Sequence, residues 1–500
     1  MIELTNYLSS TLLPNSIFMK ITRIIVAILL SGLCWYFSCD LSGNYWWLLW
    51  FAPVPVLLVS FYVGGRAAFI IAFAAYLIGR LSWLPYLLKV LPVPLAILFT
   101  VLLPLIFALL VLLTRKIILS KQNAWSAFAF PVLCCLLEFL FFKFSPDGTA
   151  GSLAYSQANF LPIVQIASVT GILGITFLVT LFPSAIAVAI YHRFNKKNRA
   201  PLYIIFSFVI ISILFGIIRI NGKSSFQNSI TGGLVVMDEK FHAETDNPEP
   251  DNEVRTANLY ANAVARLAQQ GAQVVVLPEK AVNITIATDS IIKRIFTNAA
   301  TNNHIALVAG YTEFINDSLK LNKASVISDQ SRLLADYQKV NLFEGEARNR
   351  FMPGKEIATF NLHDISSGVA ICKDLDYQNF MRKYGEKNIQ VLYVPAWDFI
   401  EDGWLHSRMA IFRGVENGYS VVRTARQGVL TISDYRGKVL NEASSTNNKA
   451  ASLLARIPLH ITKTIYKRFG DWFGFIMIVL AVYFIVILVK NKNSKRLVAK

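Results

Sequence analysis

The chain has 500 residues, of which 54% are hydrophobic and only 16% are charged, and its formal net charge is +17. Soluble domains carry roughly 25% charged residues, so this composition excludes an ordinary soluble protein and indicates a membrane protein. Because a single hydrophobic core stops growing near about 250–300 residues, the length predicts more than one domain.

Long apolar runs alternate with short loops through the first half of the chain and return near the C-terminus. A helix needs about 20 apolar residues to cross a hydrocarbon core, and about eight runs approach that length. We therefore predict a multi-pass α-helical membrane domain. The expected spans are Ile21–Cys39, Tyr45–Val63, Ala67–Leu88, Leu91–Thr114, Ala124–Phe142, Gly171–Tyr191, Pro201–Ile220 and Trp472–Val489.

Basic residues in short loops predict the orientation, because such loops stay on the cytoplasmic side. Arg115, Lys116, Lys121 and the basic tail 490–500 fall in alternate loops, so all can be cytoplasmic together. After seven crossings the large polar region then lies outside. This predicts an inner-membrane protein in three parts: a membrane domain, 1–222, with seven helices; a periplasmic domain, 223–462; and an eighth helix with a cytoplasmic C-terminus, 463–500.

The excess of positive charge is accounted for by this topology, so nucleic-acid binding is not expected. Four of the cysteines, Cys34, Cys39, Cys134 and Cys135, lie in or beside spans and are interpreted as small buried apolar residues. Cys372 is the one cysteine in the polar region and has no disulfide partner there. It is therefore a candidate reactive thiol.

Residues 232–458 alternate short β-branched runs with helical patterns, which indicates a layered α/β domain. Helical periodicity covers 254–270 and 405–416. Residues 322–328 and 333–339 are expected to form two strands joined by a turn, and the second strand ends at Lys339. The other expected strands are 233–237, 273–277, 305–310, 368–371, 390–394, 420–424 and 429–433.

Three complementary groups each follow one of these strands. Glu279 comes after an apolar strand and a proline, and a carboxylate partly removed from water suits a general base. Lys339 offers a cation that can lower a thiol pKa and hold an oxyanion. Cys372 enters a turn that exposes a nucleophile, and the N–H of Lys373 can donate to an oxyanion. Their order suggests a covalent catalyst.

Each group also has an ordinary interpretation: Glu279 as a solvated loop acid, Lys339 as a surface lysine and Cys372 as an inert buried thiol. Either Glu344 or Glu346 offers a second carboxylate near the lysine. We expect no metal and no organic cofactor.

His406, which follows Trp404 on a predicted helix, has no partner at metal-binding spacing. A packing or hydrogen-bonding role is therefore preferred for this histidine.

The motifs Leu277-Pro-Glu279, Tyr337-Gln-Lys339 and Ala370-Ile-Cys372-Lys-Asp374 resemble those of the nitrilase (carbon-nitrogen hydrolase) superfamily. The resemblance implies an αββα sandwich with a Glu-Lys-Cys triad. A sandwich of this kind placed between seven spans and an eighth resembles the apolipoprotein N-acyltransferase family. The stretches around Ala154–Gln165 and Trp404–His406 are similar to that family in spacing.

The resemblance implies a monomeric enzyme that takes an acyl chain from a glycerophospholipid onto Cys372. The thioester then passes the chain to the N-terminal amine of an S-diacylglyceryl-cysteine apolipoprotein. Lys373-Asp374 replaces the usual Tyr-Glu after the cysteine, and the segment 339–346 lacks the usual proline. These departures spare the triad but change residues expected to face the acceptor.

Two rival functions stay open at the level of sequence. One is a membrane-tethered amidase or nitrilase that releases its product to water, and the other is a non-catalytic binding protein that keeps the fold. A transferase needs an apolar mouth beside the cysteine, whereas an amidase needs a closed polar pocket. A non-catalytic protein would leave Cys372 unreactive.

Overall fold

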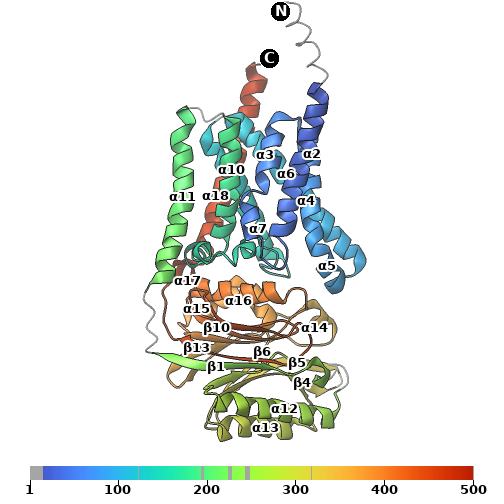
Figure 1. The fold of residues 1–500 in the computed structure, drawn as a ribbon, viewed down its shortest axis with the longest axis vertical. Helices are drawn as coiled ribbons and strands as arrows, with labels where there is room; N and C mark the ends of the chain where they lie inside the picture. The colour runs from blue at the N-terminus through green and yellow to red at the C-terminus, as the bar shows by residue number, and fades with distance from the viewer. Residues whose placement is uncertain are drawn as a thin grey trace, which may run out of the picture. The chain divides into compact units, whose positions relative to one another are not determined.

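The computed structural model describes residues 15–121, 123–192, 196–222, 228–242, 248–316 and 318–498. The chain packs as two compact units (Figure 1). One unit contains Met1–Phe139, Ile175–Ser212 and Gly474–Lys500, and the other contains Leu140–Gly174 and Ile213–Phe473. The predicted boundary at 222 and 223 borders the segment 223–227, which lies outside the described residues, as do the tail residues 499–500.

The first unit is built from long apolar helices, which confirms the predicted membrane class. Among the described residues, seven helical segments are long and apolar enough to cross a membrane: Ile21–Ser38, Gly65–Val90, Val93–Lys121, Ala124–Phe144, Leu173–Tyr191, Leu202–Asn221 and Trp472–Lys490. Where a further span was predicted, at Tyr45–Val63, the chain forms the shorter apolar run Trp46–Tyr62. A 3-10 helix and an α-helix share this run, and Pro53 starts the second of them.

The helices of the membrane-spanning part are α2 (Asn15–Ser38), η1 (Trp46–Trp50), α3 (Pro53–Tyr62), α4 (Gly65–Arg80), η2 (Leu81–Trp83), α5 (Leu84–Val90), α6 (Val93–Lys121), η3 (Ala124–Phe128), α7 (Ala129–Phe144), α10 (Leu173–Tyr191), α11 (Lys196–Asn221) and α18 (Trp472–Val498). Two ionisable side chains within them have partners in the same unit. Thr176 Oγ1 donates to Glu138 Oε2 at 2.6 Å. The Arg80 guanidinium lies 4.8 Å from the centre of the Trp83 ring. Such pairing is expected because an isolated charge in lipid is costly.

The second unit contains two β-sheets. The first has the order β13-β1-β2-β4-β5-β6, with β3 paired to β4, and the second has the order β12-β11-β10-β9-β8-β7. Their bounds are β1 Ser229–Val236, β2 Val274–Val276, β3 Val282–Ile284, β4 Ala306–Asn316, β5 Leu319–Ile327, β6 Leu333–Gln338, β7 Ala358–Leu362, β8 Ile365–Val369, β9 Val391–Trp397, β10 Ser420–Arg426, β11 Val429–Ser433, β12 Val439–Ser444 and β13 Ala451–Pro458.

Helices cover the outer faces of both sheets, as Figure 1 shows. Helices α12 (Pro250–Gln269) and α13 (Asp289–Asn302) pack on the first sheet, and α15 (Gln378–Glu386) and α16 (Gly403–Asn417) pack on the second. A third apolar cluster fills the space between the sheets. The predicted αββα sandwich is thus confirmed. The remaining helices of this unit are η4 (Leu153–Gln157), α8 (Leu161–Val164), α9 (Ala167–Thr170), η5 (Glu239–Phe241), α14 (Glu344–Arg348), η6 (Cys372–Asp376) and α17 (Ile465–Phe469).

Helix α12 shows how the sequence produces this layering. Pro250 occupies the first turn, where its missing N–H costs no hydrogen bond, and acidic residues follow it in the same turn. Along the helix, Tyr260, Val264 and Leu267 recur at helical spacing and are buried against the first sheet. One face of α12 therefore seals the sheet and the other face meets solvent.

Candidate active site

Glu279 lies just past the carboxyl end of a parallel strand. Strand β2 runs parallel to both β1 and β4, and the chain leaves it through Leu277 and Pro278. The proline cannot donate to a sheet ladder, so the strand ends there. The Glu279 N–H then donates to the Ala396 carbonyl of β9 at 3.3 Å, which places the residue where the two sheets meet. Its side chain is only 3% exposed.

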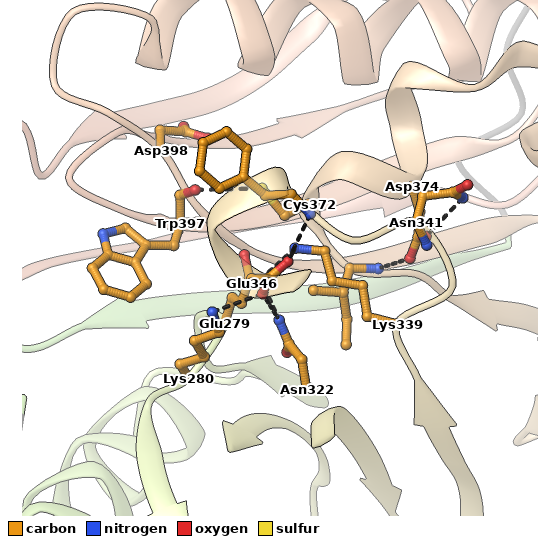
Figure 2. A network of polar contacts seen from close by, with 12 residues as sticks. Glu279, Lys280, Asn322, Lys339, Asn341, Glu346, Cys372, Asp374, Trp397 and Asp398 are labelled. Atoms are coloured by element: carbon orange, nitrogen blue, oxygen red, sulfur yellow. Dashed lines mark hydrogen bonds and ion pairs between the residues drawn. The ribbon is translucent and has the colours of Figure 1, made fainter. Parts of the chain in front are cut away.

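Lys339 follows the edge strand β6 and is fixed by its neighbour β5. The Lys339 N–H donates to the Asn322 carbonyl at 2.9 Å. The Lys339 ammonium donates to Glu279 Oε1 and to Glu346 Oε2, each at 2.8 Å. The Asn322 amide also donates to both carboxylates, at 2.6 Å each. A lysine and an amide therefore bridge two buried carboxylates (Figure 2).

Glu346 is the second carboxylate of this cluster. It lies on α14, where the Phe343 N–H donates to its Oε2 at 3.0 Å and the Lys280 ammonium lies 2.7 Å from its Oε1. Burial opposes its charge, but Lys339 and Lys280 together hold the pKa of Glu346 well below its usual range. Glu344, on the same helix, is exposed and forms an ion pair with Arg348 instead.

Lys339 keeps its charge although it is enclosed by protein. Burial by itself lowers the pKa of a lysine, but Glu279 and Glu346 outweigh this effect and raise the pKa of Lys339 well above its ordinary value. The ammonium is therefore a fixed positive charge at the site. Such a charge can stabilise an oxyanion when one forms nearby.

Cys372 occupies a sharp turn after β8. It is the first residue of η6, and its backbone φ is 42°, in the left-handed region that residues other than glycine rarely adopt. Its Sγ, half-buried, donates to the Trp397 carbonyl at 3.3 Å. Burial raises the pKa of the Cys372 thiol, the Glu279 charge raises it further, and Lys339 opposes the change. The thiol thus stays protonated until a base takes its proton, and Figure 2 shows Glu279 and Lys339 grouped near it.

Asp374 holds the turn that presents the cysteine. Its Oδ2 accepts from the Tyr337 hydroxyl at 2.6 Å and from the Ile371 N–H at 2.9 Å. Its Oδ1 accepts from the Asn341 N–H and side-chain amide, at 2.8 Å and 3.0 Å. Burial raises the pKa of Asp374, while these hydrogen bonds oppose the change. The carboxylate is fully buried and joins the turn to the segment after β6.

The side chain of Lys373 contacts an acidic pair. Its ammonium lies 2.7 Å from Asp147 and 3.6 Å from Asp376. Burial opposes its charge, but the two carboxylates raise the pKa of Lys373. The backbone N–H of Lys373, which was predicted as an oxyanion donor, belongs to the same turn as the thiol.

Trp404 and His406 lie near the start of α16. The Arg408 guanidinium is 5.4 Å from the centre of the Trp404 ring. The His406 Nδ1 lies 3.1 Å from Asp402 Oδ2. Burial disfavours a charged ring, but Asp402 outweighs it and raises the pKa of His406 to about 9. The packing and hydrogen-bonding role preferred for His406 stays a prediction.

Asn322 and Lys280 belong to the cluster but were not predicted as site residues. Asn322 interrupts an apolar strand, and because asparagine is depleted in strands its presence there was a usable signal. Lys280 gave no signal beyond its place next to Glu279.

Comparison with known families matches both halves of the chain. The profile described as "Apolipoprotein N-acyltransferase N-terminal domain" matches residues 31–185. The profile described as "Carbon-nitrogen hydrolase" matches residues 249–460, which contain Glu279, Lys339 and Cys372.

Several relatives are apolipoprotein N-acyltransferases. The chain is 23% identical over 360 residues to an apolipoprotein N-acyltransferase of Geobacter metallireducens, covering 65% of this chain and 66% of the relative. It is 20% identical to apolipoprotein N-acyltransferase 2 of Treponema denticola, covering 76% of this chain and 80% of the relative. The chain belongs to the apolipoprotein N-acyltransferase family. A relative in this family from Aquifex aeolicus is 22% identical, covering 63% of this chain and 73% of the relative.

Solved structures similar to the chain include an amidase from Nesterenkonia sp., with 19% identity and a TM-score of 0.40. The similarity covers 47% of this chain and 91% of the amidase.

Proposed function

We propose that this chain moves a fatty acyl chain from a glycerophospholipid, through a thioester on Cys372, to the N-terminal amine of an S-diacylglyceryl-cysteine apolipoprotein. The observation that carries the proposal is the buried cluster of Glu279, Lys339 and Glu346 beside a turn-mounted cysteine, in a chain that also has membrane-spanning helices. The enzyme is an N-acyltransferase, and the reaction has two half-steps.

In the first half-step, Glu279 takes the thiol proton while Cys372 Sγ bonds to the ester carbonyl carbon of the phospholipid. The Lys339 ammonium and the Lys373 N–H hold the oxyanion of the tetrahedral intermediate. When the intermediate collapses, the carbon–oxygen bond to glycerol breaks. The proton on Glu279 passes to the departing oxygen, and a lysophospholipid leaves.

In the second half-step, the neutral α-amine of the lipoprotein attacks the thioester carbonyl. Glu279 now accepts the proton of the amine, and the same donors hold the new oxyanion. The carbon–sulfur bond breaks and the proton returns to Cys372 Sγ. The products are an N-acylated lipoprotein and free enzyme, so the cycle closes without any further reactant.

Apolar side chains in the segments after Lys339 and Trp397 support transfer between lipids over amide hydrolysis. The rings of Phe343 and Phe399 pack with centres 5.6 Å apart, in the segments that follow Lys339 and Trp397. Phe399 is 37% exposed, and its neighbour Ile400 is 42% exposed. Exposed apolar residues at this place suit a fatty acyl chain better than a small polar amide.

The chain is an integral membrane protein, and the basic loops support an orientation in the inner membrane. In this proposal residues 223–462 are periplasmic and the C-terminus is cytoplasmic. Both lipid substrates then reach the cysteine by lateral diffusion, which raises their effective concentration there. The enzyme works as a monomer, with no metal, organic cofactor or nucleic acid.

The test is mass spectrometry of the purified full chain after incubation with phospholipid vesicles. We expect a fatty acyl thioester on the peptide that contains Cys372 and its loss on addition of a synthetic S-diacylglyceryl-cysteinyl peptide, which should gain one amide-linked chain. Cys372→Ala should show neither product while inserting normally into membranes. An adduct lost to water at the same rate without the peptide would favour the amidase, and full acyl transfer by Cys372→Ala would contradict the proposal.

A further inference from the structure

Lys280 is a second lysine in the carboxylate cluster. Its side chain is only 8% exposed, and its ammonium lies 2.7 Å from Glu346 Oε1. The ammonium also lies 4.5 Å from the centre of the Phe351 ring and 5.6 Å from that of Trp397. Its backbone has a φ of 53°, a conformation that a lysine rarely adopts. A buried charge on a strained backbone at an active site points to a functional role.

The two carboxylates differ in how they are hydrogen-bonded. Both accept from Lys339 and Asn322, but only Glu346 also accepts from Lys280 and from the Phe343 N–H. These four donors occupy both oxygens of Glu346. Among the described residues, the Lys339 and Asn322 bonds to Glu279 both reach Oε1, which leaves Oε2 to receive a proton.

The positive charge of Lys280 changes the net charge of the carboxylate cluster. Two buried carboxylates with one lysine carry a net negative charge, so the pair would tend to retain a proton. A second lysine brings the sum of the four side chains to zero, and both carboxylates can then be ionised. Two adjoining guanidinium groups are already paired: Arg426, which donates to the Lys280 carbonyl at 2.9 Å, is bound to Glu239, and Arg423 is bound to Asp398. The Lys320 ammonium is a further adjoining cation and lies over the Phe314 and Phe351 rings.

We propose that Lys280 is a positioning residue that holds Glu346 as a permanent anion, so that the proton of the Cys372 thiol goes to Oε2 of Glu279. The inference rests on the proposed function, because it assigns the base of that reaction. Lys280 affects how easily the Cys372 thiol loses its proton, and this property can be measured without any lipid substrate.

The test therefore measures the thiol directly. In the full-length protein in detergent, iodoacetamide alkylation of Cys372 is followed by peptide mass spectrometry from acidic to mildly alkaline pH. Alkylation forms a carbon–sulfur bond, releases iodide and transfers the thiol proton to the base. Because loss of a positive charge disfavours both the thiolate and the carboxylates, Lys280→Met should move the rate profile to higher pH by about one unit, about tenfold in rate on the acidic side.

Three further variants make the result specific. Lys280→Gln keeps a hydrogen-bonding side chain without the charge and should shift the profile like Lys280→Met. Lys280→Arg should stay near the wild-type profile. Lys293→Met removes a half-exposed lysine that is paired with Asp289, and it is the control with no expected shift.

An unshifted profile in folded Lys280→Met or Lys280→Gln would overturn the inference, and so would an equal shift in Lys280→Arg. Since alkylation needs no lipid, this result is separate from the phospholipid experiment. Wild-type protein that alkylates normally but never acquires an acyl chain would remove the proposed function and leave the thiol measurement intact.

Discussion

Asp374 is one of the residues at which this sequence is expected to depart from the family it resembles, in which a glutamate is expected at this position. The shorter carboxylate still meets four donors, from Tyr337, Ile371 and Asn341, and it is fully buried. Each oxygen of the carboxylate therefore accepts two hydrogen bonds. The departure therefore affects the support of the proposed nucleophile and leaves Glu279, Lys339 and Cys372 in place.

Replacing Asp374 by asparagine should destabilise the protein by about 2 kcal/mol, because an amide turns N–H groups toward buried donors. We expect a lower thermal unfolding midpoint and slower alkylation of Cys372. Tyr337→Phe, which removes only one of the donors, should cost about 1 kcal/mol. Wild-type stability and alkylation in Asp374→Asn would show that these hydrogen bonds do not position the turn.

Sequence reasoning at this scale found the groups with obvious chemistry and missed those that support them. Glu279, Lys339 and Cys372 were recognisable because each follows an apolar strand and matches a family motif. The pattern left Glu344 and Glu346 equivalent, since a difference of two positions on a short helix decides which side chain faces inward. That decision depends on the tertiary position of α14.

At the scale of elements, η6 is held from two sides. Besides the Asp374 contacts, the Thr149 N–H and hydroxyl donate to the Asp376 carbonyl at 2.9 Å and 2.8 Å. Lys373 forms an ion pair with Asp147 in the same loop. Gly148, between them, has a φ of 52°, and a Cβ there would come within 2.5 Å of the Asp376 carbonyl oxygen. The loop thus approaches the turn at a distance that only glycine permits.

Gly148→Ala should push this loop off η6 and slow the alkylation of Cys372 several-fold, since the clash is with backbone that cannot rotate away. Gly271→Ala is the matched control. Gly271 also has a positive φ, 94°, but nothing lies within 4 Å of its added Cβ. Both variants carry the backbone cost of about 1–2 kcal/mol. Equal alkylation rates in the two would mean that the loop does not support the cysteine.

Element prediction succeeded where apolar patterns are strong. The runs at 273–277, 390–394 and 420–424 all fall on strands of the sheet interior, where both faces are buried. The edge strands β7, β12 and β13 were not predicted, because their mixed polar residues give a weak alternating pattern. The αββα layering itself came from the family resemblance, since local periodicity does not say how sheets stack.

For the whole molecule, the distribution of Lys and Arg among the loops predicts the orientation in the membrane. The positive-inside rule places the sandwich outside, and the catalytic proposal requires this side for access to exported lipoproteins. Asn447, between β12 and β13, offers a surface position for a reporter.

A phosphatase or fluorescent reporter inserted after Asn447 should report a periplasmic location, active for the phosphatase and dark for a fluorophore that matures only in the cytoplasm. The same reporters fused after the basic tail should give the opposite readings. Cytoplasmic readings at Asn447 would reverse the assigned topology and with it the side on which acyl transfer takes place.

The exact pairing of two lysines with two glutamates has a further consequence for a protein that handles lipids. A catalytic centre with a net charge loses solvation energy when an acyl chain displaces water beside it, and this penalty would oppose binding of the substrate. Lys280, Lys339, Glu279 and Glu346 sum to zero and satisfy one another through short hydrogen bonds. Hydrocarbon can therefore cover this centre without stranding an uncompensated ion.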